Sequence, residues 1–171
     1  VHVKAIWQTS ARVSSTPHMA VVTRPRPVDV PVPTESTPVV SSTLRAWQLL
    51  SPADYVNPEP QNAYHLVVVG AGPAGLISAI GAAGLGASVA LIERHRMGGD
   101  CLNVGCMPSK SLLAYTETHK DPDFSQAFRW LRQVRADIAP HDSVQRYTDA
   151  GVDVFLGCLL YTSDAADDLG R

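Results

Sequence analysis

The most constraining feature of the sequence is a stretch from Leu66 to Ile92 that contains no charged residue. Its 27 residues are enough to cross a bilayer, so a membrane helix is the first alternative to consider. The stretch nevertheless contains six glycines and Pro73, and it divides into three parts of different character. This pattern favours a strand, a helix and a second strand over a single membrane helix.

The three parts predict a βαβ unit. Residues 65–69 are rich in Val and residues 88–92 are apolar after Ser88, as expected of parallel strands that are buried on both faces. Residues 73–85 between them are rich in Ala, Leu and Ile, with Pro73 suited to the first helical turn and Gly86 to the helix end. We therefore expect an α/β fold with a Rossmann-like βαβ domain.

The turn between the first strand and the helix has the pattern Gly-x-Gly-x-x-Gly at Gly70, Gly72 and Gly75. In this position the three glycines permit a tight turn, close approach to a pyrophosphate and close helix packing. Glu93 follows eighteen residues after Gly75, near the spacing of a carboxylate that binds a ribose hydroxyl. The pattern predicts dinucleotide binding and does not distinguish FAD from NAD.

Two cysteines, Cys101 and Cys106, lie five residues apart beyond this unit. In a regular helix their Cα atoms would be roughly 8–9 Å apart, too far for a disulfide. A bridge therefore requires an irregular segment, for which Gly105 and Pro108 are two possible causes. A cysteine at a helix start near Lys110 should also favour its thiolate. Two separate buried thiols remain the alternative, and a zinc site would be incomplete.

The segment Gly98-Gly-Asp-Cys-Leu-Asn-Val-Gly-Cys-Met-Pro-Ser-Lys110, together with the glycine turn and Glu93, resembles the N-terminal FAD domain of class I pyridine nucleotide-disulfide oxidoreductases. The Gly-Gly-Asp-Cys form and residues 138–143 (Ile-Ala-Pro-His-Asp-Ser) are most similar to mercuric reductase, with dihydrolipoyl dehydrogenase next. Asp100 departs from the threonine often found at this position in dihydrolipoyl and glutathione enzymes.

The resemblance implies an enzyme that passes electrons from NAD(P)H through FAD to the Cys101/Cys106 pair, and then to mercury(II) or a disulfide. Cys106 would be the flavin-facing thiol and Cys101 the interchange thiol. Glu93 would hold the adenosine ribose, and Lys110 would lie near the reactive edge of the flavin. The residues implied to bind FAD are Gly70, Gly72, Pro73, Ala74, Gly75, Glu93, Arg94, Gly98, Gly99, Asp100, Cys101 and Lys110. The alternatives are a non-catalytic dinucleotide-binding module and a flavin monooxygenase, which has no use for paired cysteines.

Composition narrows the partners and the cellular location. The 171 residues are 45% hydrophobic and 18% charged, with a formal net charge of −2. This composition excludes a wholly disordered chain, and the charge gives no electrostatic basis for binding nucleic acid or a membrane surface. Three cysteines are too few for a secreted disulfide framework, so we expect a cytoplasmic protein. The resemblance implies a homodimer of the parent enzyme.

Four regions are expected along the chain. Residues 1–45, rich in Pro, Ser and Thr, are expected to be disordered, and residues 46–63 to be a linker. Residues 64–157 form the predicted partial FAD domain. The segment Cys158–Asp167 resembles the translation of a transposon-end sequencing adaptor, so residues 158–171 are expected to be foreign to the fold. We accordingly expect the chain to be a fragment whose NAD(P) and dimerisation domains are missing.

Within the predicted domain, a helix is expected between Pro122 and Pro140, followed by a short helix that Asp142 and Gln145 cap and by a strand at residues 152–156. Five apolar residues recur at helical spacing and are expected to face the core: Phe124, Phe128, Leu131, Val134 and Ile138. Four arginines alternate with acids and are expected on a solvated face: Arg129, Arg132, Arg135 and Arg146.

Overall fold

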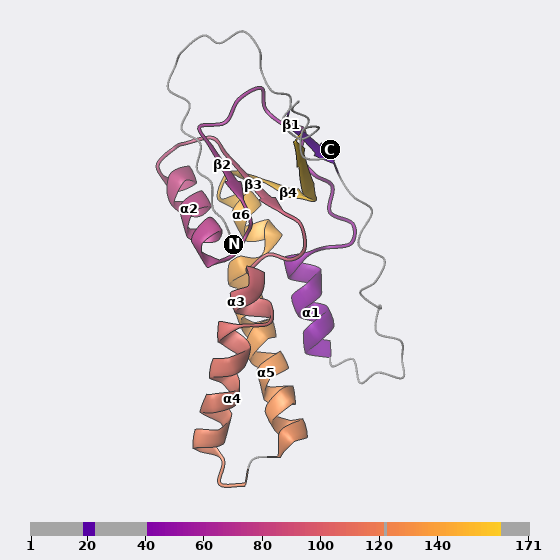
Figure 1. Cartoon of the computed structure of the whole chain (residues 1–171), viewed down its shortest axis with the longest axis vertical. Coiled ribbons are helices and arrows are strands. Elements are labelled where there is room, and N and C mark those ends of the chain that lie inside the picture. Colours follow the sequence, from indigo (N-terminus) through magenta and orange to yellow (C-terminus); the bar gives the residue numbers. More distant parts are fainter. Residues whose placement is uncertain (1–18, 23–40, 122, 162–171) are drawn as a thin grey trace, which may run out of the picture.

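The computed structural model describes residues 19–22, 41–121 and 123–161. In chain order, the elements are β1 (Met19–Val22), α1 (Ser41–Leu50), β2 (Leu66–Val69), α2 (Pro73–Gly84), β3 (Val89–Glu93), α3 (Gly99–Asn103), α4 (Cys106–Thr118), α5 (Phe124–Ile138), the 3-10 helix η1 (Ala139–Asp142), α6 (Val144–Asp149), β4 (Val152–Leu156) and β5 (Cys158–Tyr161). Figure 1 shows α4 and α5 side by side, extending away from the sheet, with α1 next to α5.

The centre of the fold is a parallel sheet with the strand order β2-β3-β4. Leu66 pairs with Val89, and Val89 in turn pairs with Val152. All five residues of the central strand β3 are buried, as predicted for a strand covered on both faces. In β2, at one edge of the described sheet, only Val68 is buried.

The predicted βαβ unit is confirmed, with α2 packed against β2 and β3. The helix begins at Pro73 and ends at Gly84, two residues before Gly86. In the described residues, no helix has both the length and the apolar character that a bilayer crossing requires. The long uncharged stretch is therefore divided between two buried strands and one helix, as its glycines predict.

Helix α1 was not predicted from the sequence. It begins at Ser41, inside the segment expected to be disordered, and ends in the expected linker. Ala46 and Leu50, four residues apart, are fully buried against the rest of the fold. One apolar face on a short helix is enough to dock it, although the surrounding composition is polar.

The expected linker is also docked on the sheet, along the outer edge of β4. The side-chain amide of Asn57 donates to the carbonyl of Leu156 at 3.1 Å and accepts from its N–H at 2.8 Å. The Tyr55 hydroxyl donates to the carbonyl of Val154 at 2.9 Å. We call residues 55–57 the edge clasp, since their side chains take the place of a neighbouring strand.

The expected foreign tail and the expected disordered region each contribute one short strand. Residues 158–161 form β5, which pairs antiparallel with β1. The remainder of both expected regions, residues 1–18, 23–40 and 162–171, lies outside the described residues.

Helix α5 forms as predicted, with the Asp123 side chain accepting from the N–H of Gln126 at 2.9 Å. Its expected core face is wrong in part, because Phe124 is 74% exposed. The buried residues of α5 are Ala127, Leu131 and Ala136. Small side chains carry much of this interface because they allow α1 and α4 to approach closely.

The expected caps and charged face also need correction. Ser143, not Asp142, caps α6, because Asp142 ends η1 while Ser143 accepts from the N–H of Arg146. Gly151 separates α6 from β4 as expected. Arg135 is half-buried between α5 and α1 rather than solvated, and one of its terminal amino groups donates to Thr43 Oγ1 at 3.3 Å.

Candidate functional site

The glycine turn connects β2 to α2 at the carboxyl end of the sheet. Gly70 has φ +99, a conformation that favours glycine. A Cβ on Gly75 would collide with the carbonyl oxygen of Gly70 and lie 3.2 Å from Val68 Cγ1, so helix and strand touch here. Gly72 caps α2 without a side-chain hydrogen bond, which leaves the first N–H groups of the helix available to an anion.

The carboxylate of Glu93 lies beside this turn, where β3 ends. Glu93 is 7% exposed, and its two oxygens accept from the N–H of Ala71 at 2.7 Å and from the N–H of His95 at 2.8 Å. Each carboxylate oxygen has a further lone pair for a ligand hydroxyl. The structure thus places Glu93 next to the predicted pyrophosphate turn and shows an additional role in fixing that turn.

The loop that follows β3 lies against the glycine turn. Gly99, at φ +56, lies so close to the turn that a Cβ would be 2.7 Å from the Cα of Gly72. Asn103 holds this loop by donating to the carbonyls of Met97 at 3.1 Å and Gly99 at 2.9 Å. Sequence reasoning missed Asn103 as a positioning residue, although it lies inside the cysteine motif.

Ten of the twelve predicted binding residues fall into two groups, while Gly98 is buried next to Leu102 and Cys101 is half-buried in α3. Gly70, Gly72, Gly75, Glu93 and Gly99 come together around one backbone-lined cradle. In contrast, Pro73, Ala74, Arg94, Asp100 and Lys110 are exposed around it. The cradle has no room for a Cβ at its closest contacts, and its helix end has unpaired N–H groups, so the residues present fit a dinucleotide.

The cysteines lie on either side of a break between two helices. Cys101 is in α3, and Cys106 is the first residue of α4. The break at Gly105 confirms the predicted irregularity, since a Cβ there would lie 3.0 Å from the carbonyl oxygen of Asp100 and 3.6 Å from the Cα of Cys101. Pro108 lies within the first turn of α4 and does not cause the break.

Both thiols are free, and they interact with one another. The side-chain hydrogen bond to Cys106 raises the pKa of Cys101, burial adds to the rise, and the positive charge of Lys110 opposes it weakly. The predicted thiolate-favouring effect of Lys110 is thus outweighed at Cys101. The two cysteines form a dithiol in which Cys101 holds its proton more firmly than an ordinary cysteine.

The relative exposure of the two thiols differs from expectation. The interchange thiol was expected to be the more exposed, but Cys106 is exposed and Cys101 is half-buried. Cys106 is the first residue of α4, whereas the Cα of Cys101 would lie 3.6 Å from a Cβ on Gly105. Among the described residues, no three His, Cys, Asp or Glu side chains are grouped as a metal site would require.

Fold and site together define a dinucleotide-binding α/β domain that carries a pair of interacting thiols. Residues 64–166 match the family described as pyridine nucleotide-disulphide oxidoreductase, and the chain belongs to this family. The FAD-binding fold expected from the sequence is thereby confirmed.

Similar proteins with curated names are dihydrolipoyl dehydrogenases. That of Corynebacterium glutamicum is 56% identical over 66 residues, which are 36% of this chain and 14% of the relative. That of Trypanosoma brucei brucei is 54% identical over 61 residues, 35% of this chain and 13% of the relative. The chain therefore spans about one seventh of the length of these relatives.

Among solved structures, the HOCl-induced flavoprotein disulfide reductase of Escherichia coli, as its Cu(II) complex, is 33% identical to this chain. The superposition has a TM-score of 0.47 and covers 52% of this chain and 21% of that protein.

Proposed function

We propose that this chain forms the FAD-binding part of an NAD(P)H-dependent oxidoreductase whose electrons reach a substrate through Cys101 and Cys106. The observation that carries the proposal is the joining of the uncapped glycine turn, the buried Glu93 carboxylate and the thiol pair through one loop. A dinucleotide module without redox function would not need the thiols. Membership of the disulphide oxidoreductase family supports the same assignment.

In the proposed complex, the N–H groups at the start of α2 hold the pyrophosphate and Glu93 accepts a hydrogen bond from the adenosine ribose. Gly98, Gly99 and Asp100 line the flavin side, with Pro73, Ala74, Arg94 and Lys110 around the cradle. FAD would supply the transfer of two electrons from NAD(P)H to the cysteine disulfide. The glycines keep side chains out of the cradle, so that the backbone donors can approach the phosphates.

The dithiol then carries the substrate step. The thiolate of Cys101 attacks one sulfur of a substrate disulfide, and the other sulfur leaves as a thiolate that takes up a proton. Cys106 next attacks Cys101 in the mixed disulfide, which releases the second substrate thiol and re-forms the Cys101–Cys106 bond. Two electrons leave the protein, and two thiols are formed.

A disulfide of the lipoamide type is the substrate class that the names of the relatives favour. Mercury(II) is the second candidate, and Asp100 in the Gly-Gly-Asp-Cys form favours it. Two thiols held close together can also bind a soft metal ion in linear geometry. In both cases we propose that the parent enzyme acts as a homodimer.

Replacement of Glu93 by Ala tests the dinucleotide site. We expect the affinity of the chain for FAD to fall by about tenfold to hundredfold, equivalent to roughly 1–3 kcal/mol, because a charge-assisted hydrogen bond is lost. ADP should lose affinity by a similar factor, since it contains the same ribose. Equilibrium dialysis with both ligands measures the effect. Glu117→Ala, at an exposed position of α4, is the matched control and should bind both normally.

Unchanged retention of FAD and ADP by a folded Glu93→Ala variant would contradict the proposed site. Because Glu93 also accepts from the N–H groups of Ala71 and His95, Glu93→Gln is measured in parallel. Its amide oxygen keeps one acceptor for the turn while it removes the charge. Circular dichroism establishes that each variant has the helical content of the parent chain.

A further inference from the structure

Two half-buried arginines, Arg96 and Arg135, lie against one face of α1. A third, Arg132, is one turn from Arg135 in α5, and its guanidinium carbon lies 5.9 Å from the centroid of the Phe128 ring. The guanidinium carbon of Arg96 lies 4.6 Å from the centroid of the Trp47 ring, and Arg135 donates to Thr43 Oγ1 at 3.3 Å. Thr43 and Trp47 are four residues apart in α1 and share a face, as do Arg132 and Arg135, three apart in α5. Helix α1 thus contacts one cation from the loop after β3 and one from α5, and Arg132 lies one turn from the latter.

Some polar side-chain atoms of α1 and α5 have no hydrogen-bond partner among the described residues. Nε of Arg135 is buried without a hydrogen-bond partner, and so is Oγ of Ser42, a residue that is 4% exposed. The guanidinium of Arg96 lies over the Trp47 ring, and its N–H groups make no hydrogen bond to the described residues. Unpaired buried donors are unfavourable unless another group satisfies them.

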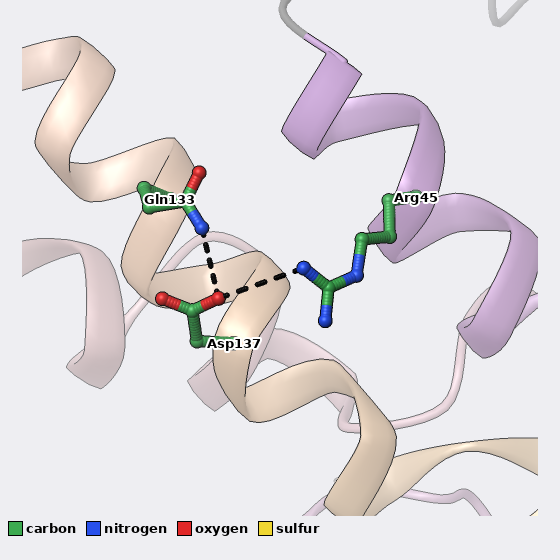
Figure 2. Close-up of polar contacts among 3 residues, drawn as sticks. All are labelled: Arg45, Gln133 and Asp137. Atoms are coloured by element: carbon green, nitrogen blue, oxygen red, sulfur yellow. Dashed lines mark hydrogen bonds and ion pairs between the residues drawn. The ribbon is translucent and has the colours of Figure 1, made fainter.

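The nearby carboxylate does not neutralise these charges. Figure 2 shows Asp137 engaged by Gln133 and Arg45. The amide of Gln133 donates to Asp137 Oδ1 at 2.8 Å, and Arg45 lies 3.8 Å from the same oxygen. Within residues 41–121 and 123–161, the contact between Arg45 and Asp137 is the only ion pair. Arg96, Arg132 and Arg135 therefore have no carboxylate partner in the described part of the chain.

The proximity of the charges is reflected in their titration. Burial lowers the pKa of Arg135, and the positive charges of Arg96 and Arg132 lower it further. Burial also lowers the pKa of Arg96. Holding the three cations together costs free energy when no anion is present, and a bound anion would reverse the sign of this interaction.

We propose that Thr43, Arg96, Arg132 and Arg135 form a binding site for a phosphate group, separate from the dinucleotide cradle. A phosphate has several acceptor oxygens and up to two negative charges, which suits three guanidinium groups and one hydroxyl better than a single carboxylate does. Figure 1 shows α1 at the right of the view and α2, at whose N-terminus the pyrophosphate of FAD is proposed to bind, at the left. The inference does not depend on the proposed redox activity.

Binding of inorganic phosphate to the full chain tests this site. Isothermal titration calorimetry at constant ionic strength should give saturable binding of one phosphate per chain. Arg135→Gln and Arg96→Gln should each weaken it at least tenfold, because a charge-assisted donor is lost. Arg129→Gln removes the same charge from an exposed position of α5 and should bind phosphate as the parent does. Acetate, with one charge, should bind at least tenfold more weakly than phosphate.

Three results would overturn the proposal. The first is the absence of saturable phosphate binding by a chain whose circular dichroism shows the expected helices. The second is an equal loss in Arg129→Gln and Arg135→Gln, which would indicate general charge screening. The third is competition of ADP with phosphate, which would place phosphate at the glycine turn. If Arg135→Gln does not fold, Arg96→Gln decides the outcome, because Arg96 lies in a loop.

Discussion

Replacement of Gly75 by Ala should abolish FAD binding and destabilise the domain. The added Cβ would collide with the carbonyl oxygen of Gly70, so α2 must move away from β2. Such overpacking reduces the free energy of unfolding by about 1–3 kcal/mol, or more where backbone is the obstacle. Movement of α2 also displaces the N–H groups proposed to hold the pyrophosphate, so we expect the affinity for FAD to fall by roughly a hundredfold or more.

Gly81 provides a control for Gly75 in the same helix. A Cβ at Gly81 meets nothing within 4 Å, so Gly81→Ala should fold normally and bind FAD like the parent chain. It should raise the free energy of unfolding by about 0.5–1 kcal/mol, because alanine loses less backbone entropy in a helix than glycine does. Urea unfolding and FAD titration of both variants measure these effects. Parent-like FAD affinity in Gly75→Ala would show that the turn is not the binding site.

Replacement of Cys101 and replacement of Cys106 should have different effects on the absorbance of the bound flavin. In the parent enzyme with FAD bound, Cys101→Ser should leave a permanent Cys106 thiolate against the flavin and show long-wavelength charge-transfer absorbance without a reductant. Cys106→Ser should show no such band, because a serine hydroxyl does not ionise at neutral pH. Both should lose dithiol-dependent turnover. A band in Cys106→Ser alone would reverse the roles proposed for the two residues, and a band in neither would remove the pair from the flavin.

The same pair has a pH signature that does not require FAD. Because the hydrogen bond to Cys106 raises the pKa of Cys101, alkylation of Cys101 by iodoacetamide should increase with pH only above the range of an ordinary thiol. Cys106→Ala removes the largest cause of this rise, so the alkylation profile of Cys101 should move to lower pH. Peptide-resolved mass spectrometry separates Cys101 from Cys158. An unmoved profile would mean that the two side chains do not interact.

The sequence was sufficient to predict the βαβ unit and the position of its turn. Buried parallel strands are apolar throughout, and a turn that must approach a helix without a Cβ leaves glycines at fixed spacing. Helix α5 was also predicted, from its apolar spacing and the prolines at positions 122 and 140. The approach of Gly99 to Gly72 was implied only by the resemblance, because no local pattern encodes a contact between two loops.

Other features depend on tertiary contacts that no local pattern encodes. Helix α1 is short and lies next to a Pro-rich, polar region, so its stability depends on docking Ala46 and Leu50. Phe124 follows the apolar period of α5 and is nevertheless exposed, because the periodic stripe extends beyond the surface that the described elements cover. The burial of Arg135 likewise depends on α1 and on Thr43.

The edge clasp leaves β2, and not β4, as the edge of the described sheet that is open to pairing with another strand. Along β4, the outward carbonyl of Val154 and both main-chain groups of Leu156 are already bonded to the side chains of Tyr55 and Asn57. An incoming strand would have to displace these bonds before it could pair there. The opposite margin, along β2, has no such cover among the described residues. Pairing of a further strand, whether from the same polypeptide or another, therefore disrupts fewer existing hydrogen bonds along β2 than along β4.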